Sequence, residues 1–208
     1  MKEELFGLTE EEYILLKNLN TPSKIQDFLN NLKINFEEQG DTCMSPRMVL
    51  RTKKAHCIEG ALVAATALRI NSYPPLIVDL EASKHDYDHV VCVFKKNNCW
   101  GAITKTNHAV LRYREPVYKN IRELVMSFFH EYFTNHNGKK TLRSYSKPVN
   151  LEIFDKYNWI ASEENVWFIP DYLTKIKHYS LLNKSQIRVL RKADLIEIKA
   201  GTLVEYEE

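Results

Sequence analysis

Residues 57–70 constrain the fold of this chain more than any other segment. They read CIEGALVAATALRI, which is rich in alanine and apolar on nearly every side of a helix. A surface helix keeps a polar face, so a helix that is apolar all round lies buried inside a domain. Asn71 and the pair Pro74-Pro75 end the segment. We therefore expect a domain that is built around one central helix.

Three short segments of strand character follow this helix, at residues 76–80, 89–94 and 99–103. Residues 95–98 join the last two in a polar turn of hairpin length. One buried helix followed by strands that pair through a hairpin is typical of an α+β fold. The prediction is a central helix packed on a small antiparallel sheet.

Helices are also expected ahead of the central helix. Thr9 and Glu12 form a capping box before an apolar stretch, which predicts a first helix. A second helix is expected to start at Thr21, to continue through Phe36 and to stop at Gly40. Both helices are amphipathic, and we interpret them as structural.

The pattern after the predicted sheet becomes less regular. Residues 119–133 return to helical periodicity, with Gly138 as a stop. Beyond this point we expect a helix at 171–179 and strands at 195–198 and 202–206. No Gly/Ser-rich linker divides the chain. We therefore predict a core with N-terminal helices over residues 1–145 and a C-terminal extension over residues 146–208 that packs on it.

The composition argues against several classes of partner. The chain has 208 residues, 44% of them apolar, which is enough to bury a sizeable core. Its net charge is +2, and its basic residues are scattered along the chain, so we expect no nucleic-acid or membrane partner. The longest mainly apolar stretch, residues 60–68, is too short to cross a bilayer, and the acidic N-terminus lacks the apolar core of a signal peptide. A cytoplasmic protein is expected.

The cysteines do not form a disulfide or metal framework. The four cysteines contain no C-x-x-C pair, and in a reducing compartment each is expected to be a free thiol. Only the neighbours His56 and Cys57 approach a metal-ligand spacing, and there is no second pair. Calcium-loop patterns are also missing from the sequence. We expect neither a metal nor a cofactor.

Cys57 is the candidate nucleophile. It stands at the start of the central helix, just after a basic loop, and both the helix N-terminus and nearby cations favour a thiolate. His89 opens the second predicted strand and is the candidate base for that thiol. His56 is given at most a supporting role, because adjacent side chains at a helix start point in different directions. The competing interpretation is that Cys57 is a small core residue.

A third residue is needed to hold the imidazole of His89. No acid lies at the matching place on the third strand, and Asn107 is the nearest amide, so Cys57, His89 and Asn107 form the predicted catalytic set. Thr104 is the alternative on geometry, because it shares strand parity with Trp100 and Ala102, although a hydroxyl orients imidazole less firmly.

The segment SPRMVLRTKKAHCIEGALVAATALRI, followed by PPLIVDL, DHVVCVF and WGAITKTNHAVLRYREPVY, resembles the transglutaminase-like superfamily of papain-type cysteine enzymes, in particular a bacterial branch with the pattern H-C-x-E-G-A. The resemblance covers roughly residues 20–145. It implies that Cys57 corresponds to the nucleophile and His89 to the base. The family's aspartate corresponds to Thr104, where this chain departs from the pattern. Either Asn107 takes the orienting role, or the triad is incomplete and the activity altered.

The resemblance implies acyl transfer through a thioester at Cys57, with a peptide or protein as substrate. Hydrolysis of an amide or isopeptide bond is expected in preference to cross-linking, because nothing in the sequence marks a second site for an amine. The alternative is a catalytically impaired domain that keeps the fold as a peptide-binding or protein-binding module.

Overall fold

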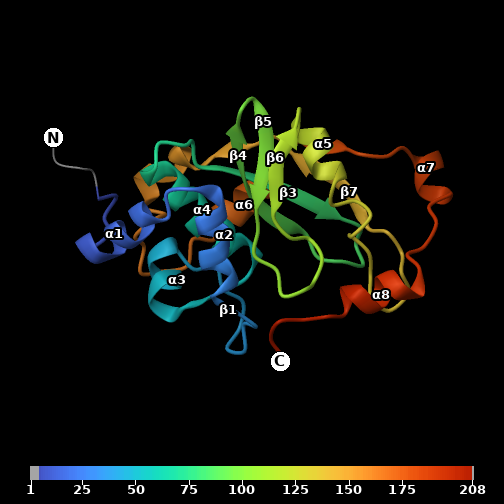
Figure 1. The fold of residues 1–208 in the computed structure, drawn as a ribbon, viewed down its shortest axis with the longest axis horizontal. Helices are drawn as coiled ribbons and strands as arrows, with labels where there is room; N and C mark the ends of the chain where they lie inside the picture. Colours follow the sequence, from blue (N-terminus) through green and yellow to red (C-terminus); the bar gives the residue numbers. More distant parts are fainter. Residues whose placement is uncertain (1–4, 208) are drawn as a thin grey trace.

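The computed structural model describes residues 5–207 and has a mixed α+β fold (Figure 1). The first four residues of the acidic N-terminal segment lie outside the described residues. The predicted central helix is confirmed as α4 (Cys57–Ile70), and all of its residues except Cys57 and Arg69 are buried. The alanine-rich sequence thus forms the centre of the molecule, and Cys57 reaches the surface at the N-terminal end of the helix.

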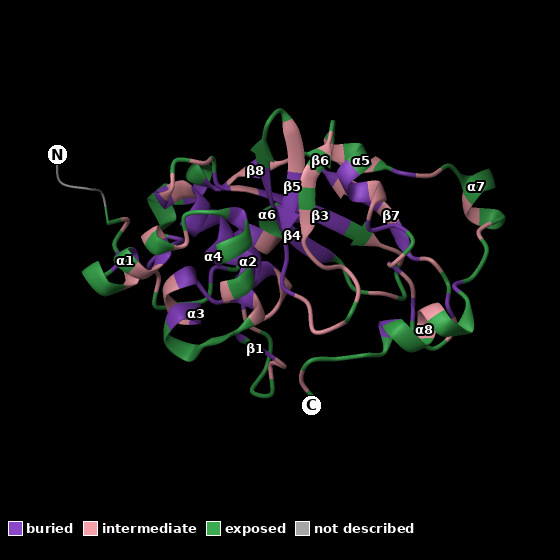
Figure 2. Ribbon diagram, in the orientation of Figure 1, coloured by how far each residue is buried: buried purple, intermediate pink, exposed green. Residues whose placement is uncertain are grey.

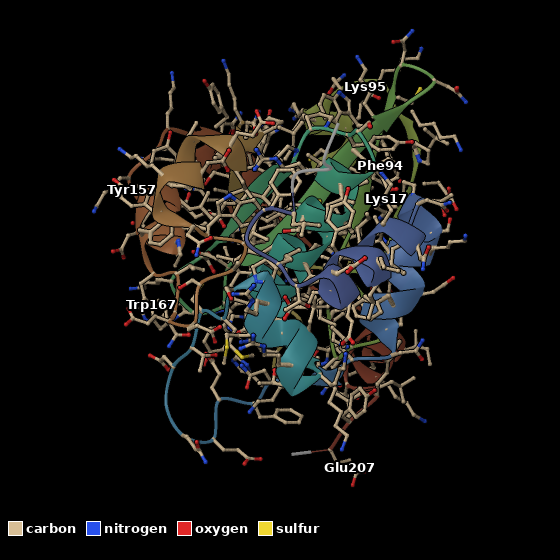
Figure 3. All side chains as sticks on the ribbon, turned by 90° about the vertical axis from the view of Figure 1, so that its left-hand side faces the viewer. Lys17, Phe94, Lys95, Tyr157, Trp167 and Glu207 are labelled. Atoms are coloured by element: carbon tan, nitrogen blue, oxygen red, sulfur yellow. The ribbon has the colours of Figure 1, made fainter. Side chains whose placement is uncertain are left out.

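Three helices surround α4 on one side of the molecule (Figures 1 and 3). They are α1 (Glu10–Asn18), α2 (Pro22–Asn30) and α3 (Pro46–Thr52). The predicted capping box of α1 is present, with Glu12 accepting from the Thr9 amide at 2.9 Å. The prediction that the second helix runs on to Gly40 is wrong. Its last turn is capped by Asn31, whose side chain donates to the Asp27 carbonyl, and the chain then forms a short strand.

That strand and a partner form a small two-stranded parallel sheet beside α3. They are β1 (Lys33–Ile34) and β2 (Lys54–Ala55). Their pairing brings residues 33–34 next to the segment that leads directly into α4. The loop between α2 and α3 is therefore anchored close to the start of the central helix.

The main sheet is antiparallel in every described pairing and has the order β6-β5-β4-β3-β7-β9, with β8 paired to β3. The three predicted strands are confirmed, and four more join them. The strands are β3 (Leu76–Ala82), β4 (His89–Lys96), β5 (Cys99–Ile103), β6 (Arg114–Tyr118), β7 (Leu142–Ser146), β8 (Val149–Asn150) and β9 (His178–Ser180). The β4–β5 turn places Asn97 and Asn98 at φ of 50° and 61°, as a two-residue hairpin requires. Residues after 145 thus contribute strands to the same sheet as the core.

The two faces of this sheet carry separate hydrophobic clusters. Alternate residues of the central strands, such as Ile77 and Cys92, pack with α4, whereas Val78 and Val91 pack with α5 (Ile121–Met126) on the other face. The expected helix at 119–133 is shorter than predicted. After Met126 the amides bond to carbonyls three residues back, which tightens the chain into turns and buries the following aromatic side chains.

The C-terminal segment differs most from its prediction. It forms the 3-10 helix η1 (Leu151–Tyr157) and the helices α6 (Phe168–Leu173), α7 (Lys184–Arg188) and α8 (Leu195–Gly201). The helix expected at 171–179 lies earlier, as α6, because residues 178–180 pair with β7. The strand expected at 195–198 is the helix α8, started by Glu197 accepting from the Asp194 amide at 2.6 Å. Residues 202–206 make only a single bridge, from Val204 to His108. Both α7 and α8 are largely exposed (Figure 2).

Candidate active site

Cys57 lies in the wall of a cleft of about 620 Å³, at the first position of α4. The first amides of a helix have no intrahelical acceptor and carry the positive end of the helix dipole. The first backbone bond within α4 runs from the Gly60 amide to the His56 carbonyl at 2.9 Å. The thiol therefore sits where negative charge is favoured, with access to the cleft.

A fully buried carboxylate, Glu59, fixes the start of this helix. It accepts hydrogen bonds from the His56 amide at 3.0 Å and from the Met44 amide at 2.9 Å. The Thr42 hydroxyl donates to it at 2.8 Å, and the Asn35 amide group donates to both of its oxygens. These four groups satisfy the buried charge of Glu59. Glu59 therefore connects the loop of residues 35–44 to the first turn of α4, where Cys57 lies.

The pKa of Cys57 lies well below that of an ordinary thiol. Burial acts to raise it, but hydrogen bonds with His56 and His89, together with the positive charge of both imidazoles, outweigh that effect. By contrast, burial raises the pKa of Cys43 and Cys92 far above the usual value. Cys57 is thus set apart from these two cysteines as a reactive thiolate.

His56 takes part in setting the charge state of the Cys57 thiol. Its Nε2 donates to the Thr42 carbonyl at 3.1 Å and lies 3.4 Å and 3.5 Å from the carboxylates of Glu59 and Glu37. Burial would lower the pKa of His56, but its hydrogen bond with Cys57 and the negative charges of Cys57 and Glu59 raise it to about 9. The ring is therefore an imidazolium at neutral pH. His56 thus lies beside the thiol, although adjacent side chains at a helix start usually point in different directions.

His89 is held by Thr104 across the second and third strands. The His89 Nε2 lies 2.7 Å from the Thr104 hydroxyl, and both side chains are buried. The Thr104 Oγ1 is also 3.2 Å from the Leu111 carbonyl, which can only accept. The hydroxyl therefore donates to that carbonyl and accepts a hydrogen bond from the His89 Nε2–H, which leaves Nδ1 as the ring nitrogen that faces the Cys57 thiol. That tautomer suits a base.

Thr104 in turn is fixed by backbone contacts. Gln26 of α2 donates to the Thr104 carbonyl at 2.8 Å and accepts from the Thr104 amide at 2.9 Å. Next to it, a Cβ on Gly60 would lie 2.5 Å from the Lys105 Cβ. The glycine therefore lets the end of β5 pack closely on the first turns of α4, which brings Thr104 near the thiol.

The prediction that Asn107 orients His89 is wrong. The Asn107 side chain donates to the Tyr206 carbonyl at 2.8 Å and accepts from the Tyr206 amide at 3.0 Å. Both polar atoms are thus used to bind the C-terminal segment to this loop. Thr104, which the strand parity offers as the alternative, occupies the orienting position.

The rest of the cleft combines apolar side chains with several titratable ones. Its walls come from the β3–β4 loop, from the segment after β5 and from residues 131–136. The Tyr132 hydroxyl donates to the Tyr87 carbonyl at 2.5 Å, and Glu131 pairs with Arg114 at 2.6 Å. These contacts tie the wall to the sheet, so the cleft is a formed feature of the fold.

Within residues 5–207, no group of three or more His, Cys, Asp or Glu side chains is placed to hold a metal ion. In the same described part of the chain, no helix is long and apolar enough to cross a membrane. The four cysteines are free thiols.

No family model matches the chain, and no curated protein matches it.

Proposed function

We propose that this protein is a transglutaminase-like cysteine enzyme that transfers an acyl group through a thioester at Cys57. The observation that carries the proposal is the placement of the Cys57 thiol, at a helix N-terminus inside a cleft and between two imidazoles. A thiolate–imidazolium pair is the activated form of a cysteine nucleophile. A purely structural cysteine at a helix start needs neither histidine.

In the first half of the reaction, the Cys57 thiolate attacks the carbonyl carbon of an amide and forms a C–S bond. Negative charge develops on the carbonyl oxygen, and the free amides of the first α4 turn stabilise it. The C–N bond then breaks, and protonated His89 gives its proton to the leaving amine. A thioester remains on Cys57.

In the second half, water attacks the thioester carbon while His89 takes a proton from it. The C–S bond breaks, Cys57 leaves as a thiolate, and a carboxylic acid is released. His56 keeps its proton near neutral pH and stabilises the thiolate in both halves. Hydrolysis of an amide or isopeptide bond in a peptide or protein is the proposed reaction, in the reducing environment of the cytoplasm where the thiol stays free.

A second candidate function rests on Thr104. A hydroxyl partner supplies no negative charge to His89, whereas a carboxylate in this position stabilises the imidazolium that forms during catalysis. A domain of this kind with impaired chemistry would keep the cleft as a site for binding a peptide or protein. The two functions differ in whether a covalent intermediate forms.

The deciding experiment is to trap the thioester. The protein is mixed with p-nitrophenyl acetate, and the modified residue is mapped by mass spectrometry before and after hydroxylamine, which cleaves thioesters. The proposal predicts an acyl group on Cys57 that hydroxylamine removes and that Cys57→Ala abolishes. Cys99→Ala is the matched control and should acylate normally. Equal acylation of Cys57 and Cys99 would support the binding module instead.

A further inference from the structure

The basic residues are scattered in the sequence but gathered in the fold. Residues 132–151 and 172–193 contain ten lysines and arginines and no aspartate or glutamate, although the whole chain carries only +2. The first stretch contains β7 and the second contains β9, which lie side by side at one edge of the sheet. Arg143, Lys147 and Lys177 are the cations within or directly beside these two strands, and they make this edge of the sheet positive.

One face of these two strands combines the cations with tyrosine rings. Tyr145 is paired directly with Tyr179, and their ring centroids are 6.1 Å apart. Because side chains alternate between faces, Lys147 and Lys177 lie on the same face as the tyrosines. Their ammonium groups lie 5.4 Å and 5.0 Å from the Tyr179 ring centroid. We call this set, Tyr145, Lys147, Lys177 and Tyr179, the basic aromatic face.

The polar residues of the opposite face are different in kind. Ser144, Ser146 and His178 alternate with the tyrosines and point the other way. The two carboxylates of β3 beside this edge are bonded there, Asp79 to His178 and Glu81 to Ser144. Asp79 and Glu81 thus bind groups on the opposite face of the sheet. They do not neutralise the cations of the basic aromatic face.

Two adjoining hollows open on the basic aromatic face. They measure about 320 Å³ and about 300 Å³ and share Lys147, Pro148 and Tyr179. Arg122 of α5 extends the first hollow, and Tyr172 of α6 extends the second. Among the described residues that line either hollow there is no carboxylate. Beyond the sheet, exposed cations continue along α7 at Lys184 and Arg188, at the right of Figure 1.

We infer that the basic aromatic face binds single-stranded nucleic acid. Bases stack on exposed aromatic rings whatever their sequence, and a row of lysines and arginines follows the phosphates. Here the half-buried rings of Tyr145 and Tyr179 border the two hollows, and Lys147 and Lys177 lie beside them. An anionic membrane surface would also contact the cations, but Tyr145 and Tyr179 are half-buried and do not form the exposed apolar face that a membrane-binding surface inserts. The site is separate from the Cys57 cleft and does not depend on the function proposed there.

The binding is tested by fluorescence anisotropy with labelled oligouridine and oligothymidine of about 12 nucleotides, over a range of salt concentrations. Wild-type protein is expected to bind, with an affinity that falls steeply with salt. Lys147→Glu/Lys177→Glu should weaken binding at least about tenfold and reduce the magnitude of the salt slope by about 1.4, since each contact to a single strand contributes about 0.7. Tyr179→Ala should weaken binding about tenfold, whereas Tyr179→Phe, which keeps the ring, should bind like wild type.

The matched control is Lys24→Glu/Lys33→Glu, which makes the same charge change at exposed positions of α2 and β1. It should stay within about threefold of wild type, because these lysines lie outside the basic aromatic face. Circular dichroism and an unchanged labelling rate at Cys57 verify that each variant is folded. An equal loss in the control variant would overturn the inference, since binding would then follow net charge alone. Binding to phosphatidylserine vesicles with no binding to either oligonucleotide would also overturn it.

Discussion

His89 and His178 each have a buried or half-buried side-chain partner at Nε2, but only His89 lies beside the Cys57 thiol. His89 lies 2.7 Å from the Thr104 hydroxyl, beside the Cys57 thiol. His178 lies 2.9 Å from the Asp79 carboxylate, behind the edge of the sheet. The partner that a catalytic histidine usually has, a carboxylate, thus belongs to the histidine that has no thiol beside it.

The other ring nitrogen explains the difference. His178 Nδ1 lies 3.1 Å from the Ile176 carbonyl, which only accepts, so this nitrogen is committed as a donor. His89 Nδ1 is left to face the Cys57 thiol and the cleft. A carboxylate partner alone therefore does not mark a reactive histidine. What matters is that one nitrogen stays available to the reacting group.

The largest effects are expected from replacing each of the two histidines in turn. His89→Ala should lower the rate of Cys57 acylation about 1,000-fold at neutral pH, because the general base and acid is lost. His178→Ala should leave that rate nearly unchanged and lower the free energy of unfolding by about 3 kcal/mol, because a buried carboxylate loses its partner. Acylation kinetics and urea denaturation measure the two effects. A large loss of activity in His178→Ala with a small one in His89→Ala would reverse the assignment.

The His178 side of the comparison has a pH signature. Burial raises the pKa of Asp79 to about 6, from 3.8, although the bond to His178 acts against it. The folded protein then holds this proton more tightly than the unfolded chain, so the contribution of Asp79 to stability is favourable below about pH 4 and is lost as the pH rises to about 6. The free energy of unfolding of wild type relative to Asp79→Asn should fall by about 3 kcal/mol over this window. The effects of Asp88, Cys57 and His178 on the pKa of Asp79 are included in that difference. A difference in unfolding free energy that does not change between about pH 4 and about pH 6 would contradict the raised pKa of Asp79.

The pKa of the Cys57 thiol should depend on His56. His56→Ala removes one imidazolium beside the thiol, so the pKa of Cys57 should rise and its labelling by iodoacetamide near pH 6 should slow about tenfold. His85→Ala, a change of the same kind elsewhere in the cleft wall, is the matched control. Equal rates for both variants would mean that His89 alone sets the thiolate.

The smallest effect concerns the residue that holds His89. Thr104→Val keeps the shape of the side chain and removes the hydroxyl, which should lower the acylation rate about fivefold to tenfold, the value of one hydrogen bond. Asn107→Ala should change the rate much less, because its amide binds Tyr206. The opposite order in steady-state kinetics would return the orienting role to Asn107.

The central helix could be predicted from the sequence because the apolar composition of its segment allows only a buried position. An alanine-rich segment such as residues 57–70 has only one favourable place in a domain, and Cys57 and His89 follow from it and from the strand pattern. The orienting residue could not be predicted in the same way. An amide such as Asn107 orients an imidazole more firmly than a hydroxyl does, but the Asn107 amide binds Tyr206. Thr104, directly after β5, has the right position and is therefore the residue that contacts His89.

The elements of the C-terminal segment could not be predicted from the sequence for a different reason. Residues 195–198 look like a strand from their apolar side chains, yet Leu195 and Ile196 are exposed and the Asp194–Glu197 cap starts a helix. The basic aromatic face depends on the pairing of β7 with β9, about thirty residues apart, so no run of charge in the sequence marks it. Long-range pairing of this kind is set by tertiary contacts.

A poised nucleophile at Cys57 can be tested by labelling the folded protein with iodoacetamide as a function of pH and following each cysteine by mass spectrometry. We predict that Cys57 reacts fastest, with an apparent pKa well below about 8.5, while buried Cys43 and Cys92 stay unmodified. A Cys57 that reacts no faster than Cys99, with an ordinary or raised pKa, would contradict it.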